Sequence, residues 1–143
     1  KVINLSELQS ADNGKKEVSA PAAEEKAPEG LSQAEKEQIL ANEGERLLGK
    51  TDERDHIIAL CIEGKKLTSE AFAAHIRTAM LAGKSRIVFI IGGSFGLHPS
   101  VKRRADMLLS FSDMTFPHQL ARVMLLEQIY RAFMISSGGK YHK

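Results

Sequence analysis

Short apolar runs alternate with amphipathic stretches along most of the chain. The runs at residues 57–62 and 87–91 are continuous and rich in β-branched residues, which predicts strands buried on both faces of a sheet. Shorter apolar runs at residues 2–5 and 108–111 predict two further short strands. Gly64, Lys65 and Lys66 follow the first long run, and we expect this segment to end the strand.

Amphipathic stretches separate these runs, and several have a recognisable start. Ser32 and Glu35 form a capping box for a helix that reaches about residue 48. Thr68 or Ser69 caps the next helix, which ends before a glycine. The residues expected on its buried side are Phe72, Ile76, Ala79 and Met80. Pro99 suits the first position of a third, shorter helix.

The most strongly patterned helix follows Pro117. Glu127 and Arg131 form an i,i+4 ion pair on one side of it. An apolar stripe occupies another side and consists of Leu120, Val123, Leu126, Ile129, Tyr130 and Phe133. The pattern alone does not say whether this stripe packs inside the chain or against another chain.

Strands that alternate with helices indicate an α/β fold, with a largely parallel sheet flanked by helices. We expect a single domain over residues 1–143. Residues 1–30 form an atypical N-terminal region, interpreted as partly disordered or shortened, because residues 9–30 offer almost nothing to bury. Ligands of such sheets bind beyond the carboxyl ends of the strands. That rule brings residues 63–65, 92–96 and 112–117 together at one edge.

Composition and charge narrow the classes of partner. The chain has 143 residues, is 43% hydrophobic and carries a net charge of +2, which permits an RNA or other anionic partner without requiring one. Its one cysteine, Cys61, excludes an internal disulfide framework and fits a reducing compartment. The apolar runs are far shorter than the roughly 20 residues that span a bilayer. We therefore expect a cytoplasmic protein without a membrane partner.

The glycine loop Gly92-Gly93-Ser94-Phe95-Gly96 is the first candidate for chemistry. Its spacing is not the G-x-G-x-x-G of dinucleotide sites, and no Lys-Ser/Thr follows it as in a Walker A loop. Glycine-rich turns after strands are also common as plain scaffold. Spacing alone leaves a ligand site and a structural turn about equally favoured.

Other chemistry receives little support from the sequence. The five histidines lack metal-ligand spacing, so no metal site is expected, and His56 and His75 are interpreted as ordinary surface or edge residues. Cys61 lies within a strand run, where it more often acts as a small hydrophobic residue than as a nucleophile. The cluster Lys102-Arg103-Arg104 is interpreted from charge alone as a solvated face, with phosphate contact to RNA as the alternative.

The segment FSDMTFPH at residues 111–118 is unusually apolar for a loop that joins a strand to a helix. With free backbone groups at the edge of a sheet, it could enclose a flat, partly apolar ligand such as an adenine ring. The alternative is that its aromatic residues pack the following helix against the sheet or against a second subunit.

Several separate segments, in the same order, closely resemble the RlmH family of small bacterial SPOUT-class methyltransferases. They are EKAPE at residues 25–29, FIIGGSFGL at 89–97, LSFSDMTFPHQ at 109–119, RV at 122–123, EQIYRA at 127–132 and YHK at 141–143. Residues 1–24 depart from the family pattern, which opens with a strand, a long amphipathic helix and a second strand. The resemblance implies a SPOUT-type fold with a C-terminal trefoil knot, and a homodimer in which the helix after Pro117 is the expected contact.

The resemblance also implies an activity. Family members transfer a methyl group from S-adenosyl-L-methionine to N3 of a pseudouridine in 23S rRNA, with the assembled ribosome as partner. Carried over by position, the expected cofactor-binding residues are Leu60, Gly92, Phe111, Ser112, Asp113, Met114, Thr115 and Phe116. The catalytic candidates are Arg122, for the negative charge that develops on the base, and Tyr141 and His142, for the N3 proton. For His118 a helix-start role is favoured, and solvent could also take the proton.

Two other readings remain open at this point. One is a non-catalytic module that binds a nucleotide or RNA at the same edge. The other is an α/β scaffold whose glycine loop is only a turn.

Overall fold

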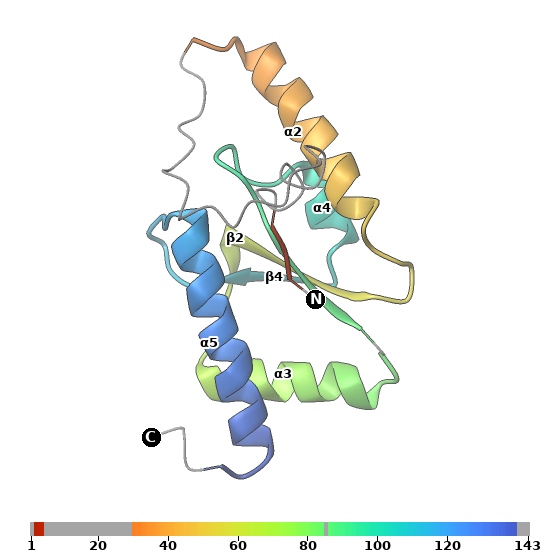
Figure 1. Cartoon of the computed structure of the whole chain (residues 1–143), viewed down its shortest axis with the longest axis vertical. Helices are drawn as coiled ribbons and strands as arrows, with labels where there is room; N and C mark the ends of the chain where they lie inside the picture. Colours follow the sequence, from red (N-terminus) through yellow and green to blue (C-terminus); the bar gives the residue numbers. More distant parts are fainter. Residues whose placement is uncertain (1, 5–29, 85, 140–143) are drawn as a thin grey trace, which may run out of the picture.

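A computed structural model of the chain describes residues 2–4, 30–84 and 86–139, and Figure 1 shows its ribbon. Within these residues the elements in chain order are β1 (Val2–Asn4), α2 (Gln33–Leu48), β2 (His56–Lys66), α3 (Ser69–Leu81), β3 (Ile87–Ile91), α4 (Pro99–Arg104), β4 (Met107–Ser110) and α5 (His118–Ser136). The expected loop over residues 9–30 lies outside the described residues, apart from Gly30.

The four strands form one sheet in the order β1-β3-β2-β4, and every pairing is parallel. The predicted α/β fold with a parallel sheet flanked by helices is therefore confirmed. β2 lies between β3 and β4, so the loops that leave β3 and β4 emerge on the two sides of its carboxyl end. This order positions the candidate site.

Each face of the sheet has its own core. α2 and α4 pack on one face and α3 and α5 on the other (Figure 1). Successive residues of β2 point to opposite faces, because a strand has a two-residue period. The core beneath α2 and α4 consists of Leu47, Ile57, Ala59, Val88, Ile90, Leu97 and Val101. The core beneath α3 and α5 consists of Ile58, Phe72, Ala73, Ile76, Phe89, Ile91, Leu109, Leu125 and Ala132.

The helix starts follow the sequence signals. Ser32 Oγ accepts a hydrogen bond from the Glu35 backbone N–H, and the Glu35 carboxylate accepts one from the Ser32 N–H, which confirms the capping box. Thr68 caps α3 by accepting from the backbone N–H of Ala71. Pro99 is the first residue of α4, as predicted. These caps satisfy backbone N–H groups that have no partner inside the helix.

The segment expected to end the first long strand, Gly64 to Lys66, is itself part of the strand, because β2 continues to Lys66. Leu60 and Lys65 both lie opposite Leu109 of β4, so residues 61–64 form a bulge between them. A Cβ at position 64 would lie 2.6 Å from the Leu109 backbone carbon. Gly64 therefore permits close approach of β4 rather than ending the strand.

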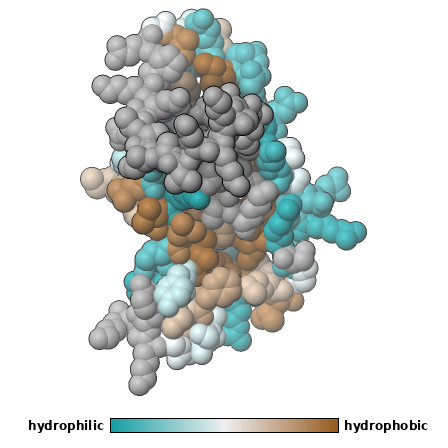
Figure 2. Space-filling model, in the orientation of Figure 1, coloured by the Kyte–Doolittle hydropathy of each residue, from teal (hydrophilic) through white to brown (hydrophobic). Residues whose placement is uncertain are grey.

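α5 carries apolar residues on two sides. Leu125 and Ala132 are buried against the sheet side, whereas the residues of the predicted stripe, except Ile129, are about half exposed. The exposed side chains, which we call the α5 apolar face, are Leu120, Val123, Leu126, Tyr130 and Phe133. Of the two packing alternatives for this stripe, an intrachain core is therefore wrong for these five residues. In Figure 2 apolar side chains gather across the middle of the face shown, around the position of α5 in Figure 1.

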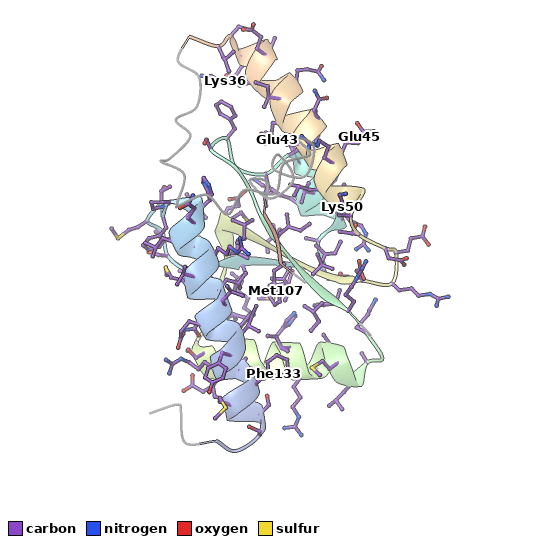
Figure 3. The ribbon with its side chains drawn as sticks, in the orientation of Figure 1. Lys36, Glu43, Glu45, Lys50, Met107 and Phe133 are labelled. Atoms are coloured by element: carbon purple, nitrogen blue, oxygen red, sulfur yellow. The ribbon has the colours of Figure 1, made fainter. Side chains whose placement is uncertain are left out.

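Charged side chains lie along α2. Figure 3 places Lys36, Glu43 and Glu45 on α2 and Lys50 just beyond its end, in the upper half, and Phe133 on the lower half of α5. Met80, expected on the buried side of α3, is 51% exposed, so that expectation is wrong. None of the helices in the described residues combines the length and the hydrophobicity that a membrane crossing needs.

Candidate functional site

A cavity of about 750 Å³ opens at the carboxyl edge of the sheet. Its walls come from the end of β2, from the glycine loop after β3 with α4, and from the end of β4 with the loop that leads into α5. The volume is within the range typical of small-molecule and cofactor sites. The lining includes Leu60, Gly92, Phe111, Ser112, Met114, Thr115 and Phe116. Seven of the eight expected cofactor-binding residues thus surround one space.

Asp113 is the exception, because it does not line the cavity. Its side chain is 79% exposed and forms an ion pair of 2.5 Å with Lys66 at the end of β2. The loop around it is held by Ser112, whose Oγ accepts from the Met114 backbone N–H and whose carbonyl accepts from the Ser110 hydroxyl. Asp113 is therefore placed to hold the loop against β2, and not to face the enclosed space.

The bulge of β2 forms part of the cavity wall. Glu63, from the segment 63–65 expected at this edge, lines the cavity, and so do Cys61 and Ile62, which were expected within a plain strand run. β-bulges are frequent next to active sites, because they redirect side chains. One glycine and two lysines at residues 64–66 are the available sequence signal, and they predict a strand end rather than a bulge.

The glycine loop requires Gly92 because its own backbone, at Gly96, packs against that position. A Cβ on Gly92 would lie 2.4 Å from the Gly96 carbonyl oxygen and 3.0 Å from Leu97 Cδ2. Gly93 and Gly96 form an isolated antiparallel bridge, and Gly96 has a φ of 82°, in the left-handed region that favours glycine. The loop folds into a tight turn whose outer surface then lines the cavity.

One ion pair lies at the cavity. Lys102 of α4 donates a hydrogen bond to Glu63 in the β2 bulge, and this contact lowers the pKa of Glu63. Burial raises the pKa of the neighbouring Cys61 thiol. The expectation of a solvated basic face fits Arg103, which is exposed, but not Arg104, whose guanidinium donates to the Asp52 carbonyl. The three basic residues of α4 therefore have three different surroundings.

Of the three catalytic candidates, Arg122 alone is among the described residues. Arg122 lies on α5 one residue beyond Ala121, which lines the cavity together with His118. Arg122 itself is half-buried and is not part of the cavity wall. Tyr141 and His142 lie outside the described residues. His118 is the first residue of α5, which agrees with the favoured helix-start role.

A histidine pair lies at the opposite end of β2. The Nε2 atoms of His56 and His75 are 2.9 Å apart, so one ring donates a hydrogen bond to the other. Asp106 is 3.8 Å from His56 Nδ1. His56 and His75, interpreted as ordinary surface or edge residues, are thus partly buried and hydrogen-bonded to each other at the start of β2. Within residues 2–4, 30–84 and 86–139, no group of three His, Cys, Asp or Glu side chains is arranged to hold a metal ion.

Comparison with known proteins assigns the chain to a family. Residues 7–142 match the family described as "Predicted SPOUT methyltransferase". The chain is 57% identical over 120 residues to a protein of Streptococcus thermophilus strain CNRZ 1066 named ribosomal RNA large subunit methyltransferase H. This alignment covers 84% of the chain and 76% of the relative. The chain belongs to the RlmH family of SPOUT methyltransferases.

Relatives from other genera agree with this RlmH assignment. Proteins with the same name from Leuconostoc citreum strain KM20 and Levilactobacillus brevis strain ATCC 367 are 55% and 54% identical, each over 84% of this chain and 76% of the relative. The match to the SPOUT family begins at residue 7. Most of residues 1–24, the segment expected to depart from the RlmH pattern, therefore fall within the matched region.

Proposed function

We propose that this chain is an S-adenosylmethionine-dependent methyltransferase that methylates N3 of a pseudouridine in 23S rRNA of the large ribosomal subunit. The observation that carries the proposal is the cavity at the carboxyl edge of the sheet, formed by the glycine loop and the loop over residues 111–117 in an RlmH-family chain. The relatives' name, ribosomal RNA large subunit methyltransferase H, supports the substrate class. We place the reaction in the cytoplasm, where ribosomes are found.

The residues present fit S-adenosylmethionine. Leu60, Ile91, Phe111 and Phe116 give the cavity apolar walls suited to an adenine ring, and the three glycines of the glycine loop bring backbone without a Cβ to the cavity surface. When bound, the cofactor supplies a methyl group on a sulfonium, an electrophile that needs no metal. The protein's task is then to hold the nucleophilic N3 in line with that methyl group.

Three side chains are proposed to act on the RNA base. Arg122 extends from the first turns of α5, next to the cavity-lining Ala121, where its positive charge can stabilise the negative charge that develops on the base oxygens. Tyr141 and His142, at the matching place of the family motif, are proposed to take part in removal of the N3 proton. Deletion of residues 141–143 is expected to abolish methylation and to leave cofactor binding largely intact. Survival of methylation would remove the tail from the active site.

We also propose a homodimer that buries the α5 apolar face, and a trefoil knot around the cavity. Five large apolar side chains, each about half exposed on one helix, are more than a monomer usually leaves in one patch. Val123→Asp, on the most exposed position of this face, is expected to convert the protein to a monomer in light scattering. A wild-type monomer at micromolar concentration would contradict the dimer. A crystal structure whose chain is threaded through no loop would contradict the knot.

The deciding test of the function is methyl transfer in vitro. Ribosomes from cells that lack the protein are incubated with it and with labelled S-adenosylmethionine, and the product RNA is mapped by mass spectrometry. We expect one added methyl group on a pseudouridine of 23S rRNA, and micromolar-scale binding of S-adenosylmethionine by calorimetry. Cofactor or RNA binding without transfer would favour the non-catalytic module. Absence of any binding or thermal shift with S-adenosylmethionine or S-adenosylhomocysteine would exclude the methyltransferase.

A further inference from the structure

The cavity contains a charge pair to which the proposed methyl transfer gives no role. Glu63 lies in the β2 bulge and Lys102 on α4, and both line the cavity. Lys102 Nζ donates a hydrogen bond to Glu63 Oε1, and the two side chains are 30% and 55% exposed. No other described residue that lines the cavity carries a carboxylate or an ammonium group.

The rest of the lining gives this pair a defined place in the site. Most of the other walls are apolar or glycine, with side-chain hydroxyls from Ser94, Ser110, Ser112 and Thr115 and the imidazole of His118. A ligand with a flat apolar part and both a positive and a negative charge therefore meets a carboxylate and an ammonium group in one region, beside Glu63 and Lys102. That region lies where the bulge of β2 meets α4, the helix that follows the glycine loop.

We propose that Glu63 and Lys102 recognise the amino-acid end of the cofactor, Lys102 binding its α-carboxylate and Glu63 its α-ammonium group. This inference rests on the proposed function and extends it to residues outside the eight expected cofactor contacts. On binding, the ion pair opens, and each side chain exchanges its protein partner for the ligand group of opposite charge. The number of opposite-charge contacts rises from one to two.

The exposure of the pair makes this exchange favourable. A partly exposed ion pair contributes little net stability, so its opening costs little. Both new contacts are charge-assisted hydrogen bonds, which are stronger than neutral ones. Lys102, and to a smaller extent the neighbouring Cys61 thiol, lower the pKa of Glu63, which favours the charged carboxylate at the cavity. The pair thus selects adenosyl ligands that carry an amino-acid zwitterion over those that do not.

The alternative is that the pair only fastens α4 to the bulge. Two ligands separate the two roles: S-adenosylhomocysteine carries the amino-acid end, whereas 5′-methylthioadenosine has the same adenine, ribose and thioether sulfur without it. Calorimetric titration of both ligands is carried out on the wild-type full chain and on Lys102→Met and Glu63→Gln. Arg103→Met is the matched control, because it removes an exposed positive charge from the same helix outside the cavity wall.

We expect each of the two cavity variants to weaken S-adenosylhomocysteine binding by roughly tenfold or more and to change 5′-methylthioadenosine binding by less than about twofold. Arg103→Met should change neither. Equal loss for both ligands in a cavity variant, or no loss for either, would overturn the proposal. If wild type binds 5′-methylthioadenosine but shows no preference for S-adenosylhomocysteine, the proposal fails while the cofactor site stands. If it binds neither S-adenosylmethionine nor S-adenosylhomocysteine, the proposed function fails as well.

A measurement on the wild-type chain covers the case in which a variant does not fold. Since both side chains reach solvent, added salt should screen their contacts with the ligand. The preference for S-adenosylhomocysteine over 5′-methylthioadenosine should therefore shrink as the salt concentration is raised. A preference that is independent of salt would contradict recognition by this pair.

Discussion

Replacement of Gly92 by alanine tests whether the glycine loop must fold tightly on itself. The added methyl carbon would lie 2.4 Å from the Gly96 carbonyl oxygen and 2.7 Å from the Gly96 carbonyl carbon. Since carbon contacts are favourable only beyond roughly 3.5 Å, the end of β3 and Gly96 must separate by roughly 1 Å. Overpacking of this kind costs about 1–3 kcal/mol. In a chain of this size, that lowers Tm by roughly 4–12 °C.

The same displacement changes the cavity, because the loop lines it. We expect Gly92→Ala to lower S-adenosylmethionine-dependent methyl transfer by roughly 100-fold, the usual scale for a misplacement of this size. Gly83→Ala is the matched control. Gly83 has a φ of 80° with open space around its Cβ position and lies just after α3, so the substitution strains the backbone without a clash or a change in the cavity.

Thermal unfolding and the methyl-transfer assay on both variants decide the outcome. Gly83→Ala should lower Tm and leave methyl transfer near wild type, whereas Gly92→Ala should lower both. Wild-type Tm and activity for Gly92→Ala would show that the loop accommodates a Cβ, and the packing argument would then be wrong. A similar loss of activity in both variants would show that reduced stability, rather than cavity geometry, is responsible.

Three further predictions concern stability. The hydrogen bonds from Arg86 lower the pKa of the buried Asp55 to about 2, so the pair stabilises the fold above the ordinary carboxyl pKa. The free energy of unfolding should therefore fall by roughly 1–2 kcal/mol as pH drops from 4 to 2, and Asp55→Asn should remove that dependence in urea unfolding. Burial and the neighbouring His56 lower the pKa of His75, so its ring binds a proton more readily in the unfolded state than in the folded state. The free energy of unfolding should therefore decline as pH falls below about 6.5, and His75→Gln should weaken the dependence of Tm on pH. Gly64→Ala would place a Cβ 2.6 Å from the β4 backbone and should cost about 1–3 kcal/mol in the same unfolding assay, and a wild-type value would contradict the close strand approach.

Much of the fold follows from the pattern of the sequence because local signals and burial agree. The run at residues 87–91 lies on a strand buried on both faces, and so does the first half of the run at 57–62, whereas Ile62 is 50% exposed. The capping box at Ser32 starts α2 as expected. The errors occur where tertiary contacts override local preference. β2 extends past Gly64 because its pairing with β4 continues there. Strand pairing uses backbone N–H and C=O groups, which polar residues such as Lys65 and Lys66 also supply.

The α5 apolar face shows a second limit of sequence patterns. Leu125 and Ala132 define one apolar side of the helix, and residues such as Val123 and Phe133 define another. Periodicity indicates that both sides are apolar, but only the position of α5 against the sheet and α3 decides which one is buried within the chain. The Glu127–Arg131 pair, by contrast, depends only on helical spacing, and the structure confirms it with a contact of 2.5 Å.

The candidate site was partly accessible from the sequence. The rule that loops meet at the carboxyl edge of a parallel sheet places the glycine loop and residues 111–117 together, and both line the cavity. The rule gives no side-chain directions, so it could not show that Asp113 turns away to Lys66. Nor could it show that Lys102 crosses to Glu63, because that contact depends on a bulge without a distinct sequence signal.

The bulge of β2 separates the chemistry of the cavity from the stability of the sheet. Residues 61–63 line the cavity between two points of strand pairing, so their side chains can be exchanged without loss of a register contact to β4. Gly64 alone is fixed there, by the β4 backbone against it. This wall of the cavity is consequently the part of the site most open to redesign: new side chains at residues 61–63 would alter which ligand is accepted, while the strands on either side keep their positions.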